Sequence, residues 1–574
     1  MKIINISIEN YRNLNAVKID FDSTCNFIVG ENNLGKSNIL NLLNTMFSRR
    51  AFWLDDFSDK ALPINIEVGL QLANEEIGHF EDLFDLDDYS KINIVCKQIT
   101  PDDNIEFYHK ETESYISASL MRCLNFIYYD SLRNPIAEIN FDKGRGVGRF
   151  LTNIVKGYLS NKELKTENLI DSGEMRGLIS DLNSKLIKIK AFKDYGVSAS
   201  VENKIEDLIP KLITLKDVKG DALSKSGYGV QFLLLVTLSI LDKLQTITEQ
   251  RGERGIFENE ENGEKSISMV LGLDEPEIHL HPYMQRSLIK YLNKVISNKN
   301  EDFTKLIKEL FNIDKFIGQI IIATHSPSII LNDYKQIIRL VKKDEKIEIV
   351  SGSKLVLGEQ LNKHLFLHFP FIKEAFFARC AIFVEGDSEF GSFPFFGEKA
   401  DIDFDDFGIT VIQAGGDSVP QLIQIAEKFG IPCIGINDND GDTSPSGIDN
   451  LLKTKERDFE AELMFLIDNG KESTLEAIVY EYDSLKSERE LDAKAINKRA
   501  YSKYGYLPEE IDFKLKLSGI DKKNIPHLKA FYSTWFSINK SQPLGRLIGL
   551  TLKHEEIPQV YKDLITTAKV KATN

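Results

Sequence analysis

The sequence predicts an α/β protein of two or three domains, and three observations support this. The chain has 574 residues, more than one hydrophobic core usually serves. Several short apolar runs, typical of buried strands, lead directly into a glycine-rich or acidic turn. These runs fall into two groups, one before and one after about residue 370. We therefore place a domain boundary near residue 370 and expect functional residues at the ends of parallel strands on both sides of it.

The composition is ordinary for a soluble globular chain, with 42% hydrophobic and 28% charged residues. A net charge of −16 argues mildly against nucleic-acid binding, although carboxylates in metal sites add to it and local basic surfaces can coexist with it. The five cysteines are scattered without metal-ligand spacing, which indicates a reduced, cytoplasmic setting. The chain opens without a signal-peptide pattern and has no run of 18 apolar residues, so we expect no membrane span.

The first elements are a strand and a phosphate-binding loop. Residues 4–8 alternate isoleucine with polar residues, as in a half-buried strand. Residues 27–29 are an apolar run typical of a buried strand, and a helical pattern begins near residue 39. Between them, residues 30–37 fit the pattern G-x-x-x-x-G-K-[ST] at every fixed position. This order of strand, loop and helix predicts a phosphate cradle made of backbone N–H groups and a helix N-terminus.

Each residue type in this loop has an expected role in binding ATP. Gly30 and Gly35 allow the backbone to curl, and Asn32 and Asn33 lie between them. Lys36 would pair with the β- and γ-phosphates, and the hydroxyl of Ser37 would bind Mg²⁺. We expect this loop to bind ATP and Mg²⁺, with Asn32 and Asn33 completing the nucleotide-binding site.

The middle of the N-terminal half changes from strands to helices. Further strands are expected at 64–68, 92–95 and 124–129, whereas apolar residues between 150 and 220 recur at helical spacing. We predict a helical insertion at 151–220, which either packs on its own sheet or forms a dimerisation arm. Residues 251–265 are charged and contain glycine, so we expect a mobile surface loop there.

A Ser/Gly loop followed by an apolar helix at 232–244 predicts a second anion-binding turn. Ser226, Gly227 and Gly229 are its small residues. The segment resembles the signature motif of ABC-type ATPases, with the consensus partly kept.

Two more apolar strands lead to candidate residues for nucleotide hydrolysis. Residues 268–273 lead to Asp274, which would hold Mg²⁺, and Glu275, which would orient and deprotonate the attacking water. Residues 319–323 lead to His325, interpreted as a switch histidine that contacts the γ-phosphate. With Lys36, these residues resemble the ATPase head of the ABC class, of the subtype shared with SMC-like proteins, over about residues 1–350. The resemblance implies a homodimer or a higher assembly, because in that class the signature loop of one subunit closes the site of another.

Acidic residues follow the strands of the second group. The strand 381–384 leads to Glu385 and Glu389, and a strand near 431–436 leads to Asp438 and Asp440. This is the layout of the Toprim fold, in which acidic side chains converge on divalent cations. Ligation by oxygen alone favours Mg²⁺ or Mn²⁺ over Zn²⁺.

A third acidic segment follows at 458–463. If it is extended, Glu460 and Glu462 lie on one side of the chain; if it is helical, they diverge, as on a solvated helix face. Both interpretations stay open at this point.

The order of an ATPase head and a Toprim domain resembles the OLD (overcoming lysogenization defect) family of nucleases, which includes Gabija-type and retron-associated anti-phage effectors. We assign residues 1–150 and 221–370 to the ATPase, 151–220 to the helical dimerisation insertion and 371–574 to the Toprim domain. The resemblance implies that Lys540 stabilises charge on the scissile phosphate, although an exposed lysine with no such role is the alternative. It also implies metal ligation in the Toprim domain by Glu385, Glu389, Asp438, Asp440, Glu460 and Glu462.

The function implied by this resemblance is an ATP-regulated, metal-dependent DNA endonuclease in anti-phage defence, with two Mg²⁺ or Mn²⁺ ions in the Toprim site. The implied partners are DNA, further copies of the chain in a homodimer or homotetramer, and a co-encoded helicase or a retron reverse transcriptase with its DNA. Two alternatives are an SMC-like, ATP-driven DNA clamp without nuclease activity and a Toprim enzyme of topoisomerase or primase type. A topoisomerase needs a nucleophilic tyrosine in a DNA-gate domain. Tyr501, Tyr504 and Tyr506 are nearby, but no such domain is evident.

Overall fold

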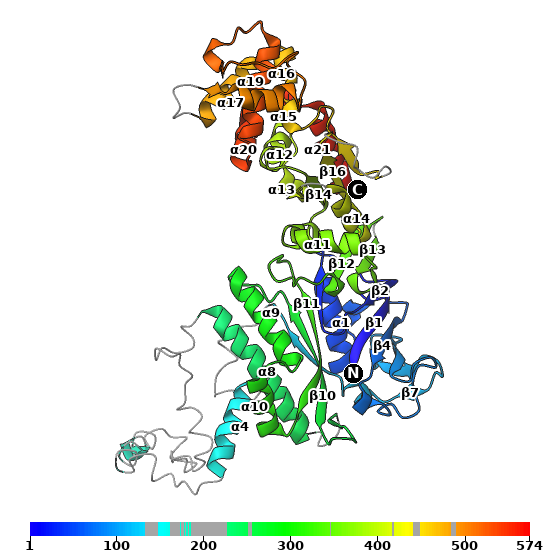
Figure 1. Cartoon of the computed structure of the whole chain (residues 1–574). Coiled ribbons are helices and arrows are strands. Elements are labelled where there is room, and N and C mark those ends of the chain that lie inside the picture. The colour runs from blue at the N-terminus through cyan, green and yellow to red at the C-terminus, as the bar shows by residue number, and fades with distance from the viewer. Residues whose placement is uncertain are drawn as a thin grey trace.

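The computed structural model describes residues 1–131, 147–160, isolated positions between 173 and 184, 227–250, 255–344, 346–415, 418–439, 448–483 and 489–573. The molecule is elongated. In Figure 1 the N-terminal part, coloured blue to green, lies at one end, and the C-terminal part, coloured olive to red, lies at the other. Helices α11 (Glu359–Ile372) and α14 (Val419–Lys428) lie between them.

An antiparallel sheet forms one side of the N-terminal part. Its strand order is β2-β1-β4-β5-β6-β7. The bounds are β1 (Lys2–Glu9), β2 (Val17–Asp20), β4 (Ile64–Gln71), β5 (Lys91–Gln98), β6 (Glu106–His109) and β7 (Tyr115–Ile116). Alternate isoleucines of β1, β4 and β5 are buried, as the period-two pattern predicts. The strands expected at 4–8, 64–68 and 92–95 are confirmed.

A second, mostly parallel sheet forms the centre, in the order β13-β12-β3-β11-β10-β8, with β9 paired to β10. Its strands are β3 (Cys25–Val29), β8 (Asn125–Tyr129), β9 (Phe257–Glu258), β10 (Lys265–Asp274), β11 (Lys315–Ala323), β12 (Ile337–Lys343) and β13 (Lys346–Ser351). β3 is buried along its whole length and β10 along nearly all of it, because helices or a second sheet cover both faces. The parallel pairing brings the carboxyl ends of β3, β10 and β11 to one edge.

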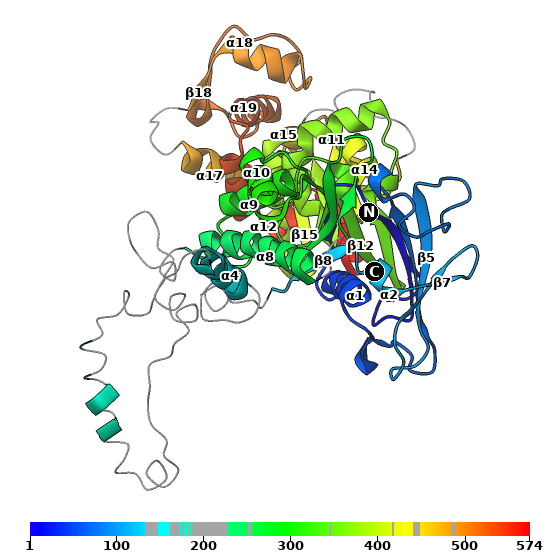
Figure 2. The ribbon, with the colours of Figure 1, turned by 90° about the horizontal axis from the view of Figure 1, so that it is seen from below.

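Helices fill the two faces of this central sheet. α1 (Lys36–Ser48) packs between it and the antiparallel sheet, with Ile39, Leu40 and Leu43 buried there. The opposite face is covered by helices that Figure 2 shows on the side away from β5. These are α4 (Val147–Ser160), α8 (Tyr228–Gln250), α9 (Pro282–Ile296) and α10 (Glu301–Phe311). The short helix α2 (Ala118–Met121) precedes β8.

Among the described residues, α8 is long and apolar enough over Tyr228–Glu249 to cross a membrane by length and composition alone. In the structure its residues Val236, Ile240 and Leu244 are fully buried in the core beneath the central sheet. Core helices pass the same test of length and composition, so packing against the sheet explains the apolar character of α8.

One expectation for the middle of the chain needs correction, and another lies largely outside the described residues. Residues 257–258 and 265–266 pair as an antiparallel hairpin, so the predicted surface loop is partly regular structure. Between β13 and β14, α11 buries Leu365 and Phe369. Of the helical insertion at 151–220, the structure describes α4 and isolated positions only.

The C-terminal part is built on a parallel sheet of order β15-β14-β16-β17. These strands are β14 (Cys380–Val384), β15 (Ile409–Gln413), β16 (Cys433–Asn437) and β17 (Leu451–Lys453). A small hairpin follows, β18 (Glu490–Leu491) with β19 (Leu515–Lys516). The helices after α11, besides α14, are α12 (Asp387–Lys399), α13 (Phe404–Phe407), α15 (Phe459–Glu462), α16 (Phe465–Asp468), α17 (Glu472–Tyr482), α18 (Ala493–Ile496), α19 (Ile525–Ile538), α20 (Gln542–Thr551) and α21 (Gln559–Thr573).

One hydrophobic core runs from the central sheet into the C-terminal part. It includes Tyr334 after β11, Phe376 before β14 and Phe429 after α14. The rings of Phe376 and Phe429 meet edge to face at 5.0 Å between centroids. The five cysteines are all free and buried, in agreement with a protein without disulfide bonds.

Candidate nucleotide and metal sites

The phosphate loop has the backbone shape that its glycines predict. Gly30 and Gly35 have φ of 135° and 95°, a region that residues with a Cβ rarely adopt. A Cβ at Gly30 would lie 2.4 Å from the carbonyl oxygen of Leu340 on β12. The loop therefore needs glycine at this position for its dihedral angles and for its close approach to β12.

Lys36 begins α1 beneath this loop. Its Nζ donates to the carbonyl oxygens of Gly30 at 2.9 Å and Glu31 at 2.6 Å. Burial lowers the pKa of Lys36 to about 8, and the nearby carboxylates of Glu275 and Asp274 oppose part of that shift. Lys36 is buried, and an ammonium group held by carbonyl oxygens is suited to bind phosphate oxygens.

Ser37 and Asp274 meet across the site, as expected for a pair that holds Mg²⁺. The Ser37 hydroxyl donates to Asp274 Oδ1 at 2.8 Å, and the Tyr128 hydroxyl donates to Asp274 Oδ2 at 3.3 Å. Burial raises the pKa of Asp274 to about 6, against the opposing effect of the Ser37 hydrogen bond. Burial makes the ionised form of this carboxylate costly unless a cation is bound beside it. This is what a Mg²⁺ ligand requires.

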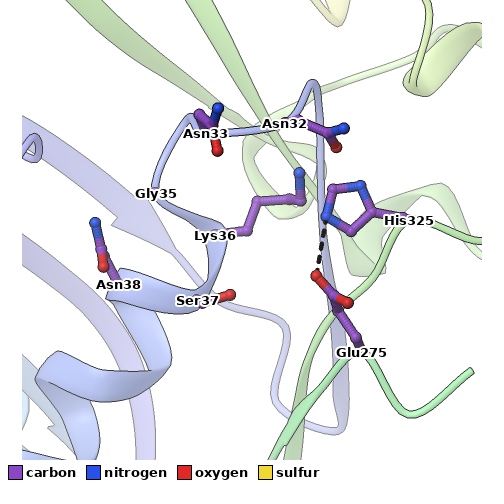
Figure 3. A pocket seen from close by; sticks show the side chains of 8 residues that line it. All are labelled: Asn32, Asn33, Gly35, Lys36, Ser37, Asn38, Glu275 and His325. Carbon is purple, nitrogen blue, oxygen red and sulfur yellow. Dashed lines mark ion pairs between the residues drawn. The ribbon is translucent and has the colours of Figure 1, made fainter. Parts of the chain in front are cut away.

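Glu275 and His325 stand opposite Lys36 in one pocket of about 680 Å³. Its lining residues are Asn32, Asn33, Gly35, Lys36, Ser37, Asn38, Glu275 and His325, all shown in Figure 3. His325 Nε2 lies 3.3 Å from Glu275 Oε1. Glu275 has a φ of 45°, an uncommon conformation that the bond from its N–H to the Ala323 carbonyl, at 2.9 Å, helps to hold.

Glu277 is a site residue to which the sequence analysis gave no role. Its Oε1 accepts from the Thr324 hydroxyl at 2.8 Å and from the His325 N–H at 2.6 Å. This carboxylate therefore fixes the turn that carries His325. The feature of the sequence that could have indicated Glu277 is its position in the acidic motif, two residues after Glu275 and at the same edge of the sheet.

A polar group after β1 was also missed. The Asn38 amide donates to Asn13 Oδ1 at 2.7 Å, and Arg12 Nη1 donates to Asn38 Oδ1 at 2.6 Å. A Cβ at Gly35 would lie 2.7 Å from Asn13 Oδ1. Arg12 and Asn13 thus support the phosphate loop from outside. The feature of the sequence that could have indicated them is the polar turn after the first strand.

Of the signature-like loop, Ser226 lies outside the described residues, whereas Gly227 and Gly229 stand at the start of α8. Neither glycine is among the residues that line the pocket around Lys36. A Cβ at Gly229 would lie 2.7 Å from Met284 on α9, so this glycine allows close helix packing.

In the C-terminal part, two acidic residues meet at the ends of neighbouring parallel strands. Glu385 follows β14 and Asp438 follows β16, and β14 pairs with β16. The backbone N–H of Asp438 donates to Glu385 Oε2 at 3.2 Å. The structure therefore brings these two predicted ligands together, whereas Asp440 lies outside the described residues.

Glu389 and Lys540 join this cluster from two helical segments. Glu389 lies in the first turn of α12 and is 2% exposed, and Lys540 precedes α20. A Cβ at Gly386 would lie 2.5 Å from Glu389 Oε2 and 3.0 Å from Lys540 Nζ. Both side chains therefore lie against the backbone of Gly386. Burial alone would lower the pKa of Lys540, but the carboxylates of Glu460, Glu389 and Asp438 outweigh it and raise the net pKa.

The acidic segment at 458–463 is helical, so the extended arrangement considered above is wrong. Asp458 caps α15 by accepting from the Ala461 N–H at 2.9 Å. Glu460 faces the cluster: its Oε1 accepts from Ser388 at 3.0 Å and its Oε2 lies 3.5 Å from Lys540 Nζ. Glu462 instead accepts from the backbone N–H of Glu456 at 2.7 Å, which closes a loop. The helix separates the two glutamates, as it must at a spacing of two residues.

The chemistry of the cluster fits a divalent cation. Glu389 Oε2 and Asp438 Oδ1 are buried and have no hydrogen-bond partner within the described part of the chain. Burial raises the pKa of both groups, and neighbouring carboxylates raise it further. Buried carboxylate oxygens without donors are costly unless a cation neutralises them. No three of the described His, Cys, Asp or Glu side chains are already gathered at ligand distances, so metal binding would require them to move closer.

The hydroxyl of Tyr504, one of the three tyrosines considered as a nucleophile, is engaged in a hydrogen bond. Tyr504 donates to Asp458 Oδ2 at 2.7 Å, and Lys503 Nζ lies 2.5 Å from the same oxygen. Burial raises the pKa of both Tyr504 and Tyr506. Tyr504 thus holds Asp458, which caps α15, in place.

Comparisons with known proteins match both parts of the chain. A family model for the AAA ATPase domain matches residues 1–143 and 148–330, and one for the Overcoming lysogenization defect protein-like TOPRIM domain matches residues 376–440. Endonuclease GajA of Bacillus cereus strain HuB5-5 is 22% identical over 58% of this chain and 50% of that protein. Endonuclease GajA of Bacillus cereus strain VD045 is 24% identical over 77% of this chain and 75% of that protein. The chain thus spans about half of the first relative and three quarters of the second.

Solved structures show partial likeness to each part of the chain. The C-terminal region of the Xanthomonas campestris pv. campestris OLD protein is 18% identical, covers 35% of this chain and 96% of its own, and has a TM-score of 0.24. The SmcHead bound to the C-winged helix domain of ScpA is 15% identical, covers 61% of this chain and 98% of its own, and has a TM-score of 0.31. At these scores the likeness carries no argument by itself.

Proposed function

The chain belongs to the OLD family of proteins that join an ATPase domain to a Toprim domain, and we propose that it is an ATP-regulated, metal-dependent DNA endonuclease in anti-phage defence. The observation that carries this proposal is the cluster of Glu385, Glu389, Asp438 and Glu460, which has Lys540 beside it. Glu389 and Glu460 are buried, and Glu385 and Asp438 are partly buried. Carboxylates at parallel-strand ends with a lysine beside them suit the hydrolysis of a phosphodiester. The Toprim domain at 371–574, the ATPase parts at 1–150 and 221–370 and the insertion at 151–220 remain our domain assignment.

The residues of the C-terminal cluster have distinct roles in this proposal. Glu385, Glu389, Asp438, Asp440 and Glu460 would hold Mg²⁺ or Mn²⁺, and two such ions would supply Lewis acidity to the water and to the leaving oxygen. Lys540, charged at neutral pH, would stabilise negative charge on the phosphate. Glu462 was included among the ligands, but its contact with the backbone of Glu456 supports a role in holding the loop instead.

In the nucleotide site, Lys36 and the loop N–H groups would bind the ATP phosphates, and Ser37 with Asp274 would hold Mg²⁺. Glu275 would orient and deprotonate the water, and His325, paired with Glu275, would contact the γ-phosphate. Ser226, Gly227 and Gly229 would close the site of another subunit. This requires a homodimer or homotetramer, which mass photometry with and without ATP tests.

The test is cleavage of supercoiled and linear DNA with Mg²⁺ or Mn²⁺, with and without ATP. We expect nicks from the unaltered protein and none from Asp438→Asn, while Asp468→Asn, which changes an exposed carboxylate, cleaves normally. An SMC-like clamp predicts that Asp438→Asn leaves function intact. A covalent DNA–tyrosine adduct or primer synthesis would favour a topoisomerase or primase. A cytoplasmic location and a co-encoded helicase or retron reverse transcriptase as partner are tested by fractionation and by co-purification.

A further inference from the structure

A buried arginine joins the two parts of the chain. Arg339 on β12 is 2% exposed, and its hydrogen-bond acceptors within the described residues are all main-chain carbonyls. Its Nη1 donates to Gly430 at 2.6 Å and to Phe429 at 3.4 Å. Its Nε donates to Phe376 and its Nη2 to Ala378, both at 3.2 Å. Burial lowers its pKa to about 10, so the guanidinium stays charged at neutral pH.

The carbonyls that Arg339 binds lie where two important strands begin. Phe376 and Ala378 lead into β14, and the residues just after α14 lead into β16. The other ends of β14 and β16 carry Glu385 and Asp438. One side chain of the ATPase domain therefore fixes the starting points of both strands that present the metal-binding carboxylates.

The same arginine is adjacent to the phosphate loop. On β12, Arg339 is in register with Val29, the last residue of β3 before the loop begins. The next residue on β12, Leu340, has its carbonyl oxygen 2.4 Å from where a Cβ of Gly30 would stand. The first residue of the loop therefore lies directly on the strand that carries Arg339.

A second contact links the loop to the start of β14 on the surface. Arg379 immediately precedes β14, and its Nε lies 2.9 Å from Glu31 Oε2 in the loop. Both side chains are partly exposed, at 52% and 32%. The carbonyl oxygen of Glu31 in turn accepts from Lys36 Nζ. Lys36, Glu31, Arg379 and β14 thus form a continuous chain of contacts that ends at Glu385.

We infer that Arg339 and Arg379 couple the phosphate loop to the Toprim carboxylates, with Arg339 as the fixed joint and the Arg379–Glu31 ion pair as the adjustable contact. This inference rests on the proposed function for its effect on cleavage. When phosphates bind, Lys36 turns from the loop carbonyls to the phosphate oxygens, and new negative charge approaches Glu31. The ion pair then changes strength, and Arg379 transmits the change to the start of β14.

The Arg379–Glu31 ion pair is exposed, and exposed ion pairs contribute little free energy. We therefore expect it to account for about a two- to five-fold part of the change in cleavage rate that ATP causes. By reciprocity of binding free energies, the factor by which ATP changes cation affinity at the Toprim site equals the factor by which a bound cation changes ATP affinity. Arg339 and Arg379 are positioning residues, since neither lines the nucleotide pocket.

The test is Arg379→Gln, with Lys522→Gln as matched control. Lys522 makes a similarly exposed ion pair with Glu476, at 3.4 Å, inside the C-terminal part and away from the loop. We expect Arg379→Gln to cleave DNA normally without nucleotide and to lose about two- to five-fold of the change in cleavage rate that ATP causes. The control should keep the full ATP effect. An Arg379→Gln protein with an undiminished ATP effect would overturn the inference.

Amide hydrogen exchange supplies a second measurement that does not depend on cleavage. In the unaltered protein and in Lys522→Gln, ATP should change the exchange of residues 373–386, and in Arg379→Gln it should not. If no preparation cleaves DNA, the proposed function fails while this measurement still decides the coupling. If ATP binds but leaves exchange at 373–386 unaltered in the unaltered protein, the coupling is refuted even where DNA is cleaved.

Discussion

Adding one methyl group at Gly545 should disable the proposed nuclease site while leaving the proposed ATPase site intact. Gly545 lies on α20, five residues after Lys540, at the point where α20 crosses α12. A Cβ there would stand 2.3 Å from the carbonyl oxygen of Ser388, the residue before Glu389. The obstacle is backbone, so rotation of a side chain cannot relieve it.

The size of the effect follows from this distance. Ordinary contacts begin at 3.4 Å, so Gly545→Ala must move α20 away from α12 by about 1 Å. Overpacking of this kind costs roughly 1–3 kcal/mol of stability. The same shift moves Lys540, now 3.5 Å from Glu460, away from the carboxylates. A displacement of about 1 Å at catalytic groups can lower the rate by about 100-fold.

The assay is metal-dependent DNA cleavage by Gly545→Ala, with ATP hydrolysis as the measure of an intact N-terminal part. Gly519→Ala is the control, because a Cβ at that position meets nothing within 4 Å. We expect a loss of cleavage of at least ten-fold in the first variant, an order-of-magnitude bound, and none in the second. A folded Gly545→Ala protein that cleaves DNA like the unaltered one would refute the claim that this helix crossing positions Lys540.

Two further outcomes are expected. Arg339→Met removes the donor of four carbonyls, so we expect the free energy of unfolding to fall by about 2–4 kcal/mol in urea denaturation; an unchanged midpoint would contradict this. Burial, and then the charge of Lys36, lower the pKa of His325 below its ordinary value of 6.5, so the imidazole is neutral at pH 7. The neutral imidazole of His325 therefore contributes its whole stabilisation of the fold above pH 6.5. This stabilisation is lost as the pH falls from 6.5 through the lower pKa of the folded state. Asp274, with a pKa of about 6, gains a proton in the same range. ATP hydrolysis should therefore decline below pH 6.5 in the unaltered protein and less steeply in His325→Gln, where only the Asp274 step remains; equal pH profiles would contradict this.

Several elements could be predicted from the sequence because their signals are local. The strands that carry Gly30, Asp274 and His325 are short apolar runs with polar residues at the end, and the loop motif lies between a strand and a helix. Parallel pairing then brings those ends to one edge, so the residues of the nucleotide site could be named without coordinates. Glu385 and Asp438 follow the same rule in the second sheet, where the pairing of β14 with β16 brings them together.

Other features depend on the packing of segments far apart in the chain. Lys540 reaches Glu389 because Gly391 and Gly545 let α12 and α20 approach closely, and no local pattern encodes a contact between residues so distant in sequence. Whether Glu460 or Glu462 faces the cluster was decided by the helical form of α15. The sequence alone determined which residues stand at strand ends, because strand and turn preferences are local. Only the tertiary structure decided which side chains meet across elements and that Arg339 joins the two parts, because close packing and the satisfaction of buried polar groups act on the folded chain as a whole.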